Sequence, residues 1–338
     1  MNDGELRRFA DSVRLRAVRM VAPHGLGYLG QALSSAEMMA ALYRTAYRPG
    51  LDQLVCSPGH YVIAVFAAAA EAGLIDENLL SAYGFDDSPL EAIGTERSPE
   101  VDLTCGSLGL GLSGGAGFAL SNRLRGNDDA RVFVIGSDGE LEEGQTWEAA
   151  LFAAHHRLGR LVLLLDANDS QVDGPVSSIS TVEPVAAKWE AFGWDARDVD
   201  GHDPGAVAAA LAAAAGGDRP SVIVARTSAR HGLSVLPPDA DGHFVKLSPE
   251  LARRAAAELE ERLAVAETLA TAGLGRPLRR VGLRDTFAEG AGTTPHLFRK
   301  YGLSTRDVVA AAWSALGRDD PPPAVPGVPA AAGEYAPV

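Results

Sequence analysis

This 338-residue sequence has few cysteines, few aromatic residues and too few basic residues to balance its acidic ones. Its two cysteines, Cys56 and Cys105, cannot supply the several disulfides that stabilise small secreted proteins, so we expect a reducing, cytoplasmic location. The formal net charge of −14 repels a phosphate backbone and an anionic membrane surface. We therefore expect neither nucleic acid nor a membrane as a partner.

Long apolar runs are also missing. No stretch reaches the roughly 20 residues that a membrane-spanning helix needs. Residues 1–20 mix charged and apolar side chains at helical spacing, and they lack the apolar centre of a signal peptide. A hydrophobic content of 46% and a charged content of 22% are typical of a globular protein, and the length suffices for one large α/β domain with an appendage.

Two short apolar runs, each followed by polar residues, are the most informative feature of the sequence. The runs RVFVI (131–135) and LVLLL (161–165) lead into GSDG and DAND, and apolar residues at helical spacing lie between about 145 and 158. A strand–helix–strand unit makes its two strands parallel, so both strand ends point to one edge of the sheet. Asp138 and Asn168 can then meet over one cation, and oxygen ligands suit Mg²⁺ better than zinc.

The same two residues have an ordinary structural interpretation. Asp138 can cap the following helix and Asn168 can shape a turn, and residue type and spacing alone leave both interpretations open. Further apolar patterns predict a doubly wound parallel sheet with helices on both faces. They predict helices over residues 5–20, 183–192, 204–215 and 249–269, strands over 194–199 and 221–225, a helix capped by Ser34 and Ser35, and a glycine-rich turn over 106–117.

Several longer motifs resemble those of transketolases, a family of thiamine diphosphate enzymes. GSDGELEEG and DANDSQVDG resemble the family's diphosphate-binding motif. Four other segments resemble further family motifs, HGLGYLGQALSSAEMMAALY, SPGHYVIAVFAAAAEAGLI, TCGSLGLGLSGGAGFAL and GWDARDVDGHD. The resemblance covers roughly residues 5–250. It implies a thiamine diphosphate-binding domain over residues 1–270, with thiamine diphosphate and Mg²⁺, or Ca²⁺ or Mn²⁺ in its place, as cofactors.

The resemblance also implies the residues of the site. The metal would be held by Asp138, Asn168 and the backbone oxygen of Ser170. The cofactor would be contacted by a larger set, His60, Gly106, Ser107, Leu108, Gly139, Glu143, Asn168 and His243. His60, His243 and Tyr28 would have catalytic roles.

Three of these assignments have alternatives. His60 can be an exposed histidine at the start of a helix. His231 competes with His243, because the loop from Ser228 to Asp241 departs from the family pattern. Glu143 corresponds to a residue in the buried contact that links paired active sites, but a first-turn glutamate is also favoured by the helix dipole.

The sequence departs from the family pattern at two histidines. Tyr28 stands where the family has one histidine, and Gly94-Thr95-Glu96 replaces a segment that carries another. Because tyrosine has an unperturbed pKa near 10, it mostly donates a hydrogen bond where histidine could exchange a proton. A changed donor or a non-sugar acceptor is therefore expected. The string GLGLSG (109–114) fits a dinucleotide-binding pattern, but no acidic strand end follows about 20 residues later, which disfavours a nicotinamide dehydrogenase.

The resemblance implies a partner. Transketolases activate the cofactor through a glutamate of a second domain, which has no counterpart here. We expect a second subunit that carries the pyrimidine-binding domain and most of the third domain, in an α₂β₂ assembly. After a linker (271–277), residues 278–317 resemble the end of a transketolase third domain and would complete the partner's domain, or else form an independent appendage. Residues 318–338 are expected to be a disordered tail.

The expected function is that of the diphosphate-binding subunit of a two-component transketolase-like enzyme. It would transfer a two-carbon ketol unit from a ketose phosphate, the small-molecule donor, to an acceptor. The alternative is a catalytically silent transketolase-like scaffold or regulatory subunit.

Overall fold

The computed structural model describes residues 2–214, 217–237 and 239–271, with side chains as far as residue 264. The chain divides into two units, residues 1–266 and 267–338, and the features below belong to the first. The linker from residue 272 on, the segment 278–317 and the tail 318–338 predicted from the sequence lie outside the described residues. Within the described ranges, no helix combines the length and apolar character needed to cross a membrane.

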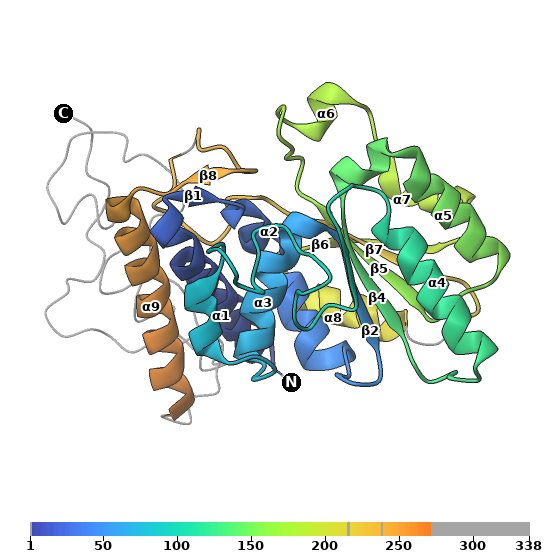
Figure 1. Cartoon of the computed structure of the whole chain (residues 1–338), viewed down its shortest axis with the longest axis horizontal. Coiled ribbons are helices and arrows are strands. Elements are labelled where there is room, and N and C mark those ends of the chain that lie inside the picture. Colours follow the sequence, from blue (N-terminus) through green and yellow to red (C-terminus); the bar gives the residue numbers. More distant parts are fainter. Residues whose placement is uncertain (1, 215–216, 238, 272–338) are drawn as a thin grey trace, which may run out of the picture. The chain divides into compact units, whose positions relative to one another are not determined.

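The centre of the first unit is a six-stranded sheet in which all neighbouring strands are parallel (Figure 1). The strand order is β3-β2-β4-β5-β7-β6. The strands are β2 (Gln53–Pro58), β3 (Leu103–Cys105), β4 (Val132–Ser137), β5 (Leu161–Ala167), β6 (Asp195–Asp200) and β7 (Ser221–Arg226). A separate antiparallel pair joins β1 (Leu26–Gly27) to β8 (Val245–Lys246).

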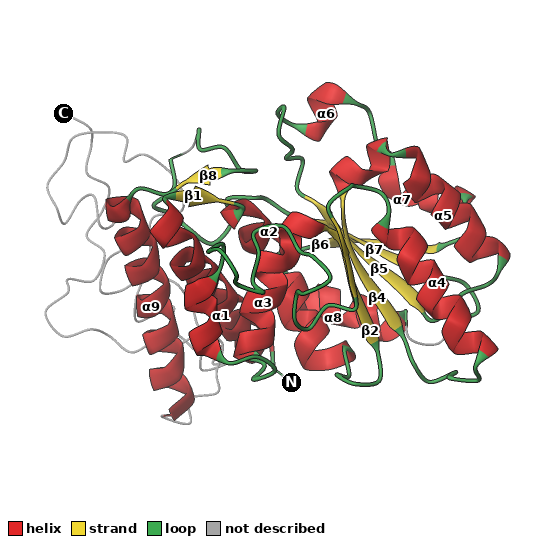
Figure 2. Ribbon diagram, viewed as in Figure 1, coloured by secondary structure: helices red, strands yellow, loops and turns green. Residues whose placement is uncertain are grey.

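Helices cover both faces of the sheet (Figure 2), which confirms the predicted doubly wound architecture. One face carries α2 (Leu29–Ala41), α3 (Val62–Glu71) and α8 (Pro204–Ala213). On this side α1 (Asp3–Val21) packs against α2 and α3, and α9 (Pro249–Thr271) adds residues to the same core. The other face carries α4 (Gly111–Leu124), α5 (Gly144–His155) and α7 (Val185–Ala191). A short helix, α6 (Val176–Ile179), lies in the loop after β5.

Strand β4 shows why these sequences form such a sheet. Phe133 and Ile135 belong to the core under α1, α2, α3 and α8, whereas Val132 and Val134 belong to the core under α4, α5 and α7. Successive side chains of a strand point to opposite faces, so an unbroken apolar run is what a strand buried on both faces requires. A Cβ at Gly115 of α4 would lie 2.5 Å from Val134 Cγ2, so this glycine allows the helix to pack closely on the sheet.

The structure corrects three expectations about the elements. Helix α2 begins at Leu29, so Ser34 and Ser35 lie inside a helix and the predicted cap there is wrong. Helix α4 begins at Gly111, so the second half of the predicted glycine-rich turn is helical. Two strands were not expected: β2, and the short edge strand β3 formed within VDLTC (101–105).

The strand order creates a switch point between β2 and β4. From β2 the chain adds β3 on one side and then returns to add β4 on the other side of β2. In doubly wound sheets the connections diverge at such a point, and the crevice outside the carboxyl ends of the strands is where ligands bind. The segments that follow β2, β4 and β5 therefore define the place to search for a site.

Candidate functional site

The predicted metal ligands follow adjacent strands at this edge of the sheet. Asp138 follows β4, Asn168 follows β5, and Ser137 pairs with Asp166 in the parallel register. The two loops are in direct contact, because the backbone N–H of Asp169 donates to Asp138 Oδ2 at 2.7 Å. The structure thus brings together the residues that the spacing of the two apolar runs placed at one edge.

Asp138 is a buried carboxylate whose described contacts include no positively charged side chain. It is 5% exposed and accepts hydrogen bonds from the backbone N–H groups of Asp169 and Gly139, the latter at 2.9 Å. Burial raises the pKa of Asp138 to about 7, and the negative charge of Asp166 acts in the same direction. A cation bound here would favour the charged carboxylate, since an opposite charge stabilises the ionised form.

Asn168 is oriented by a network around a neighbouring buried carboxylate. Its Nδ2 group donates to Asp166 Oδ2 at 2.9 Å and to the Tyr61 hydroxyl at 3.1 Å. Its Oδ1 accepts from the backbone N–H of Ser170 at 2.9 Å. The amide nitrogen is therefore held on the Asp166 side, and the amide oxygen faces the turn that also contains Ser170.

Asp166 was missed as a site residue in the sequence analysis. It is completely buried and accepts hydrogen bonds from Ser34, Tyr61, Asn168 and Thr227. One feature of the sequence could have indicated this burial. Asp166 directly follows five apolar residues, so the strand can continue through it. Strand β5 does continue through Ala167, which places Asp166 inside the molecule instead of at the start of a loop.

Ser170 lies in a constrained turn beside His243. The residue before it, Asp169, has a φ of 54°, a left-handed conformation that aspartate tolerates better than most residues. The Asp169 carboxylate accepts hydrogen bonds from the backbone and the hydroxyl of Ser177, which hold the turn in place. The segment that carries His243 adjoins this turn, because a Cβ added to the preceding Gly242 would lie 3.2 Å from Ser170 Oγ.

Tyr28, His60 and His243 form one cluster. The ring centroid of Tyr28 lies 5.0 Å from that of His60 and 5.8 Å from that of His243, and the centroids of the two histidine rings are 5.0 Å apart. Phe244 packs against Tyr28 with a centroid distance of 5.0 Å. Burial, reinforced by His243, lowers the pKa of His60 to about 3, and burial also lowers the pKa of His243. Both imidazoles are therefore neutral near pH 7.

The competing histidine, His231, lies in a different cluster. Its ring stacks on His202 with centroids 3.5 Å apart, and its Nε2 is 3.9 Å from Glu37 Oε1. Their ligand atoms are close enough together to suggest a metal site. However, His202 Nε2 accepts a backbone hydrogen bond from Ser228 and its Nδ1 faces Glu37, which also pairs with Arg14. Both nitrogens of His202 are already used, so this arrangement explains local packing better than metal binding.

The glycine-rich loop presents its predicted contact residues at the surface. Gly106, Ser107 and Leu108 are exposed, and a Cβ at Gly106 would meet no described atom within 4 Å. Packing within the described chain therefore does not require glycine at position 106, whereas close approach of a ligand to the main chain would. Glu143 is also exposed, at the start of α5, where its Cβ would lie 2.7 Å from a Cβ added to Gly109.

The segment that replaces the second family histidine lies close to His60. The backbone N–H of Gly94 donates to the carbonyl of Gly59 at 2.9 Å, next to His60. A Cβ at Gly94 would lie 2.5 Å from Val62 Cγ1, so this segment packs tightly on the start of α3. The departure from the family pattern at residues 94–96 therefore lies beside the imidazole cluster.

The donor set fits a hard divalent cation. A carboxylate, an amide oxygen and backbone groups at the ends of β4 and β5 are the ligand types that Mg²⁺ and Ca²⁺ prefer. The segment carrying His243 adjoins the Ser170 turn, and His60 lies beside His243, so these groups form one site near the switch point of the sheet. Fold and site together define a doubly wound α/β protein with a cluster of polar groups at the carboxyl edge of its strands.

Comparison with known proteins specifies the class further. Residues 6–255 match the family model described as transketolase, thiamine diphosphate binding domain. A transketolase family protein of Sinorhizobium fredii is 38% identical over 252 residues, which cover 71% of this chain and 90% of the relative. The chain belongs to the transketolase family.

Two further relatives are named as parts of divided transketolases. The 6-deoxy-6-sulfo-D-fructose transketolase subunit of a Clostridium species is 34% identical, over 76% of this chain and 97% of its own length. An apulose-4-phosphate transketolase subunit of Actinobacillus succinogenes is 33% identical, over 69% of this chain and 87% of its own length.

Solved transketolases share the fold. The Campylobacter jejuni enzyme matches with a TM-score of 0.66 and 21% identity, over 89% of this chain and 56% of its own. A Pichia stipitis transketolase variant matches with a TM-score of 0.64 and 22% identity, over 80% of this chain and 45% of its own. The chain thus spans about half the length of these solved enzymes.

Proposed function

We propose that this chain is the thiamine diphosphate- and metal-binding subunit of a two-component transketolase-like enzyme. The observation that carries the proposal is the convergence of Asp138, Asn168 and the Ser170 turn with His60 and His243 near the switch point of the sheet. The relatives named as transketolase subunits support it, because this chain covers almost their whole length.

Each part of the site has a distinct task in this proposal. Asp138, Asn168 and the backbone oxygen of Ser170 would hold Mg²⁺, which would bridge to the diphosphate. The exposed main chain at Gly106 suits close approach of phosphate oxygens. When bound, thiamine diphosphate supplies a nucleophilic carbon that accepts and releases a two-carbon ketol unit.

The imidazole cluster would act on the substrate side. His60 and His243 are neutral near pH 7, so each can donate one hydrogen bond to an oxygen of the substrate or cofactor. Tyr28 adds a hydroxyl donor where other members have histidine. We propose an acceptor that needs a hydroxyl donor for orientation at this position more than exchange of a proton with an imidazole.

Binding of the cofactor and metal tests this function. Isothermal calorimetry of the purified chain, alone and with its partner, is expected to show thiamine diphosphate binding that requires Mg²⁺. Asp138→Ala is expected to weaken this binding at least tenfold, because it removes the charged ligand. Leu124→Ala, an exposed position on α4, is the matched control. Binding that is unaffected by Asp138→Ala and independent of Mg²⁺ would contradict the proposal.

The partner is the second part of the proposal. A protein with a pyrimidine-binding domain would supply the glutamate that activates the cofactor, in an α₂β₂ complex with a ketose phosphate donor. Co-purification of the two chains, with ketol transfer seen only in the mixture, is the expected result. If the chain binds cofactor and partner but ketol transfer by the partner is the same with and without it, the catalytically silent scaffold is favoured. Tyr28 in place of the family histidine is the observation behind that alternative.

A further inference from the structure

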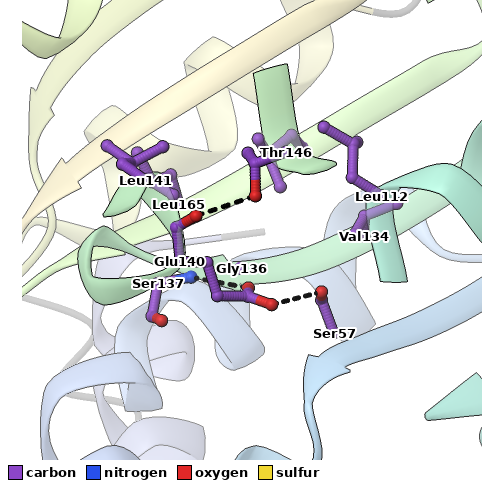
Figure 3. Close-up of a pocket in the computed structure, with 10 residues that line it drawn as sticks. Ser57, Leu112, Val134, Gly136, Ser137, Glu140, Leu141, Thr146 and Leu165 are labelled. Atoms are coloured by element: carbon purple, nitrogen blue, oxygen red, sulfur yellow. Dashed lines mark hydrogen bonds between the residues drawn. The ribbon is translucent and has the colours of Figure 1, made fainter. Parts of the chain in front are cut away.

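Glu140 is a buried carboxylate that links three parts of the site. It is 4% exposed, and its Oε1 accepts hydrogen bonds from Ser57 Oγ at 2.6 Å and from the backbone N–H of Gly109 at 2.8 Å. Its Oε2 accepts from the backbone N–H of Ser137 at 3.4 Å. Figure 3 shows the side chain extending toward Ser57 from the turn that follows β4.

The three donors belong to three different segments of the site. Ser57 lies near the end of β2, which leads to His60, and Ser137 directly precedes Asp138. Gly109 closes the exposed loop that begins at Gly106. Ser57 and Gly109 are separated from Glu140 by 83 and 31 positions in the sequence. One carboxylate therefore connects the imidazole, glycine-loop and metal-ligand segments.

The connection to the glycine loop is reinforced by a second bond. Ser57 Oγ accepts a hydrogen bond from the backbone N–H of Gly111 at 3.1 Å, at the first residue of α4. Gly109 has a φ of +79°, a left-handed conformation, so the loop turns sharply where Glu140 holds it. Both ends of the turn into α4 are thus fixed by the pair Glu140 and Ser57.

The surroundings strengthen these bonds. A small pocket beside Glu140 is lined mainly by apolar side chains, Leu112, Val134, Leu141, Leu163 and Leu165 (Figure 3). A hydrogen bond to a carboxylate is stronger in such surroundings than in water, and loss of the acceptor leaves its buried donors without a partner. The hydroxyl of Thr146 lies in the same pocket, beside Gly109, and donates to the backbone carbonyl of Glu140 at 2.7 Å, so its hydrogen bond goes to the turn and not to the loop.

We propose that Glu140 is a positioning residue that holds the loop 106–109 against the turn containing Asp138 and thereby preforms the cofactor site. The identity of the cofactor in this inference rests on the proposed function. The claim that Glu140 holds the loop does not, because it follows from the hydrogen bonds within the chain. In this proposal neighbouring residues contact the cofactor, and Glu140 acts by positioning them.

Three variants test the proposal. Glu140→Ala removes the acceptor. Glu140→Gln keeps an oxygen for Ser57 and Gly109 and loses only the longer bond from Ser137. Thr146→Val has nearly the same shape as the wild-type residue and removes a bond from the same pocket, so it controls for a general loss of stability.

The first measurement is amide hydrogen exchange of the segment 106–111 in the chain without cofactor. Glu140→Ala is expected to raise the exchange rate about tenfold or more, the effect of losing a hydrogen bond to a charged group. Glu140→Gln is expected to stay within about threefold of wild type, because the principal acceptor is retained. Unchanged exchange in Glu140→Ala, or an equal increase in Thr146→Val, would overturn the proposal.

The second measurement is the affinity for thiamine diphosphate with Mg²⁺, in the complex with the partner. Glu140→Ala is expected to weaken binding about 10- to 100-fold, with recovery in Glu140→Gln and no comparable loss in Thr146→Val. Faster exchange without a loss of affinity would refute the positioning role. If the wild-type protein binds no cofactor, the proposed function fails, and the exchange measurement alone decides whether Glu140 holds the loop.

Discussion

Substitution of Asp166 separates the hydrogen-bonding role of a buried carboxylate from its charge. In wild type, Oδ2 accepts from Ser34 at 2.5 Å, Tyr61 at 2.8 Å and Asn168 at 2.9 Å, and Oδ1 accepts from Thr227. Asp166→Ala removes all four acceptor contacts in a position with no exposure to solvent. Asp166→Asn keeps one carbonyl oxygen for the three donors that share Oδ2, and its amide group can donate to the Thr227 hydroxyl.

The expected magnitudes differ accordingly. A buried donor left without a partner costs about 1–3 kcal/mol. Ser34 keeps a second acceptor, the carbonyl of Gln31 at 3.2 Å, and the Asn168 amide keeps the Tyr61 hydroxyl at 3.1 Å, so the donors left unpaired in Asp166→Ala are chiefly Tyr61 and Thr227. We expect Asp166→Ala to lower the free energy of unfolding by about 2–6 kcal/mol, and Asp166→Asn by about 1 kcal/mol or less.

Urea denaturation at pH 7, followed by the fluorescence of the fully buried Trp189 and Trp194, measures both values. The metal is omitted so that only the network is tested. Equal destabilisation by the two variants would refute the reasoning, because it would show that the charge of Asp166 matters and its hydrogen bonds do not. A loss below about 1 kcal/mol in Asp166→Ala would show that the donors find other partners.

Two further predictions concern His60 and Gly30. Because the pKa of His60 is lowered to about 3, the unfolded chain binds a proton below pH 6.5 while the folded chain does not, so stability falls as pH drops from 6.5 toward 3. Urea unfolding at pH 7 and pH 5 is expected to show that His60→Asn removes about 2 kcal/mol of this loss; identical pH dependence in the variant would disprove the assignment. A Cβ at Gly30 would lie 1.6 Å from the carbonyl oxygen of Gly242, so Gly30→Ala is expected to cost about 3 kcal/mol by thermal or urea unfolding. Gly117→Ala, an exposed helical position with no atom within 4 Å, is the control and should stabilise by about 0.5–1 kcal/mol; equal effects of the two would contradict the steric argument.

The elements that the sequence predicted correctly are those specified by local patterns. Strands β4 and β5, with α5 between them, follow from two apolar runs and a helical spacing of apolar residues, and their parallel pairing follows from the handedness of the crossover. This was enough to place Asp138 and Asn168 at one edge. The capping prediction at Ser34 failed because α2 begins at Leu29, and the Ser34 hydroxyl instead donates to Asp166, which lies 132 residues away and outside any local pattern.

Selection among similar side chains depended on the tertiary structure. The sequence offers both His243 and His231 as candidates for the same site histidine. Only the folded structure shows that His243 lies beside His60 and that His231 stacks on His202. The resemblance directed attention to Glu143, yet the structure buries Glu140 and leaves Glu143 exposed.

The sequence alone determined the alternating strands and helices and, through motif resemblance, the family, because periodicity and motif spacing are properties of neighbouring residues. It also predicted Asp138 and Asn168 as oxygen ligands. The tertiary structure decided which carboxylates are buried and which groups donate to them. Burial and hydrogen bonding at the sheet edge depend on segments such as Ser57, Gly109 and Glu140, which come together only when β2, α4 and β4 pack. The residue types therefore determine which chemical groups are available, and folding determines how these groups are arranged.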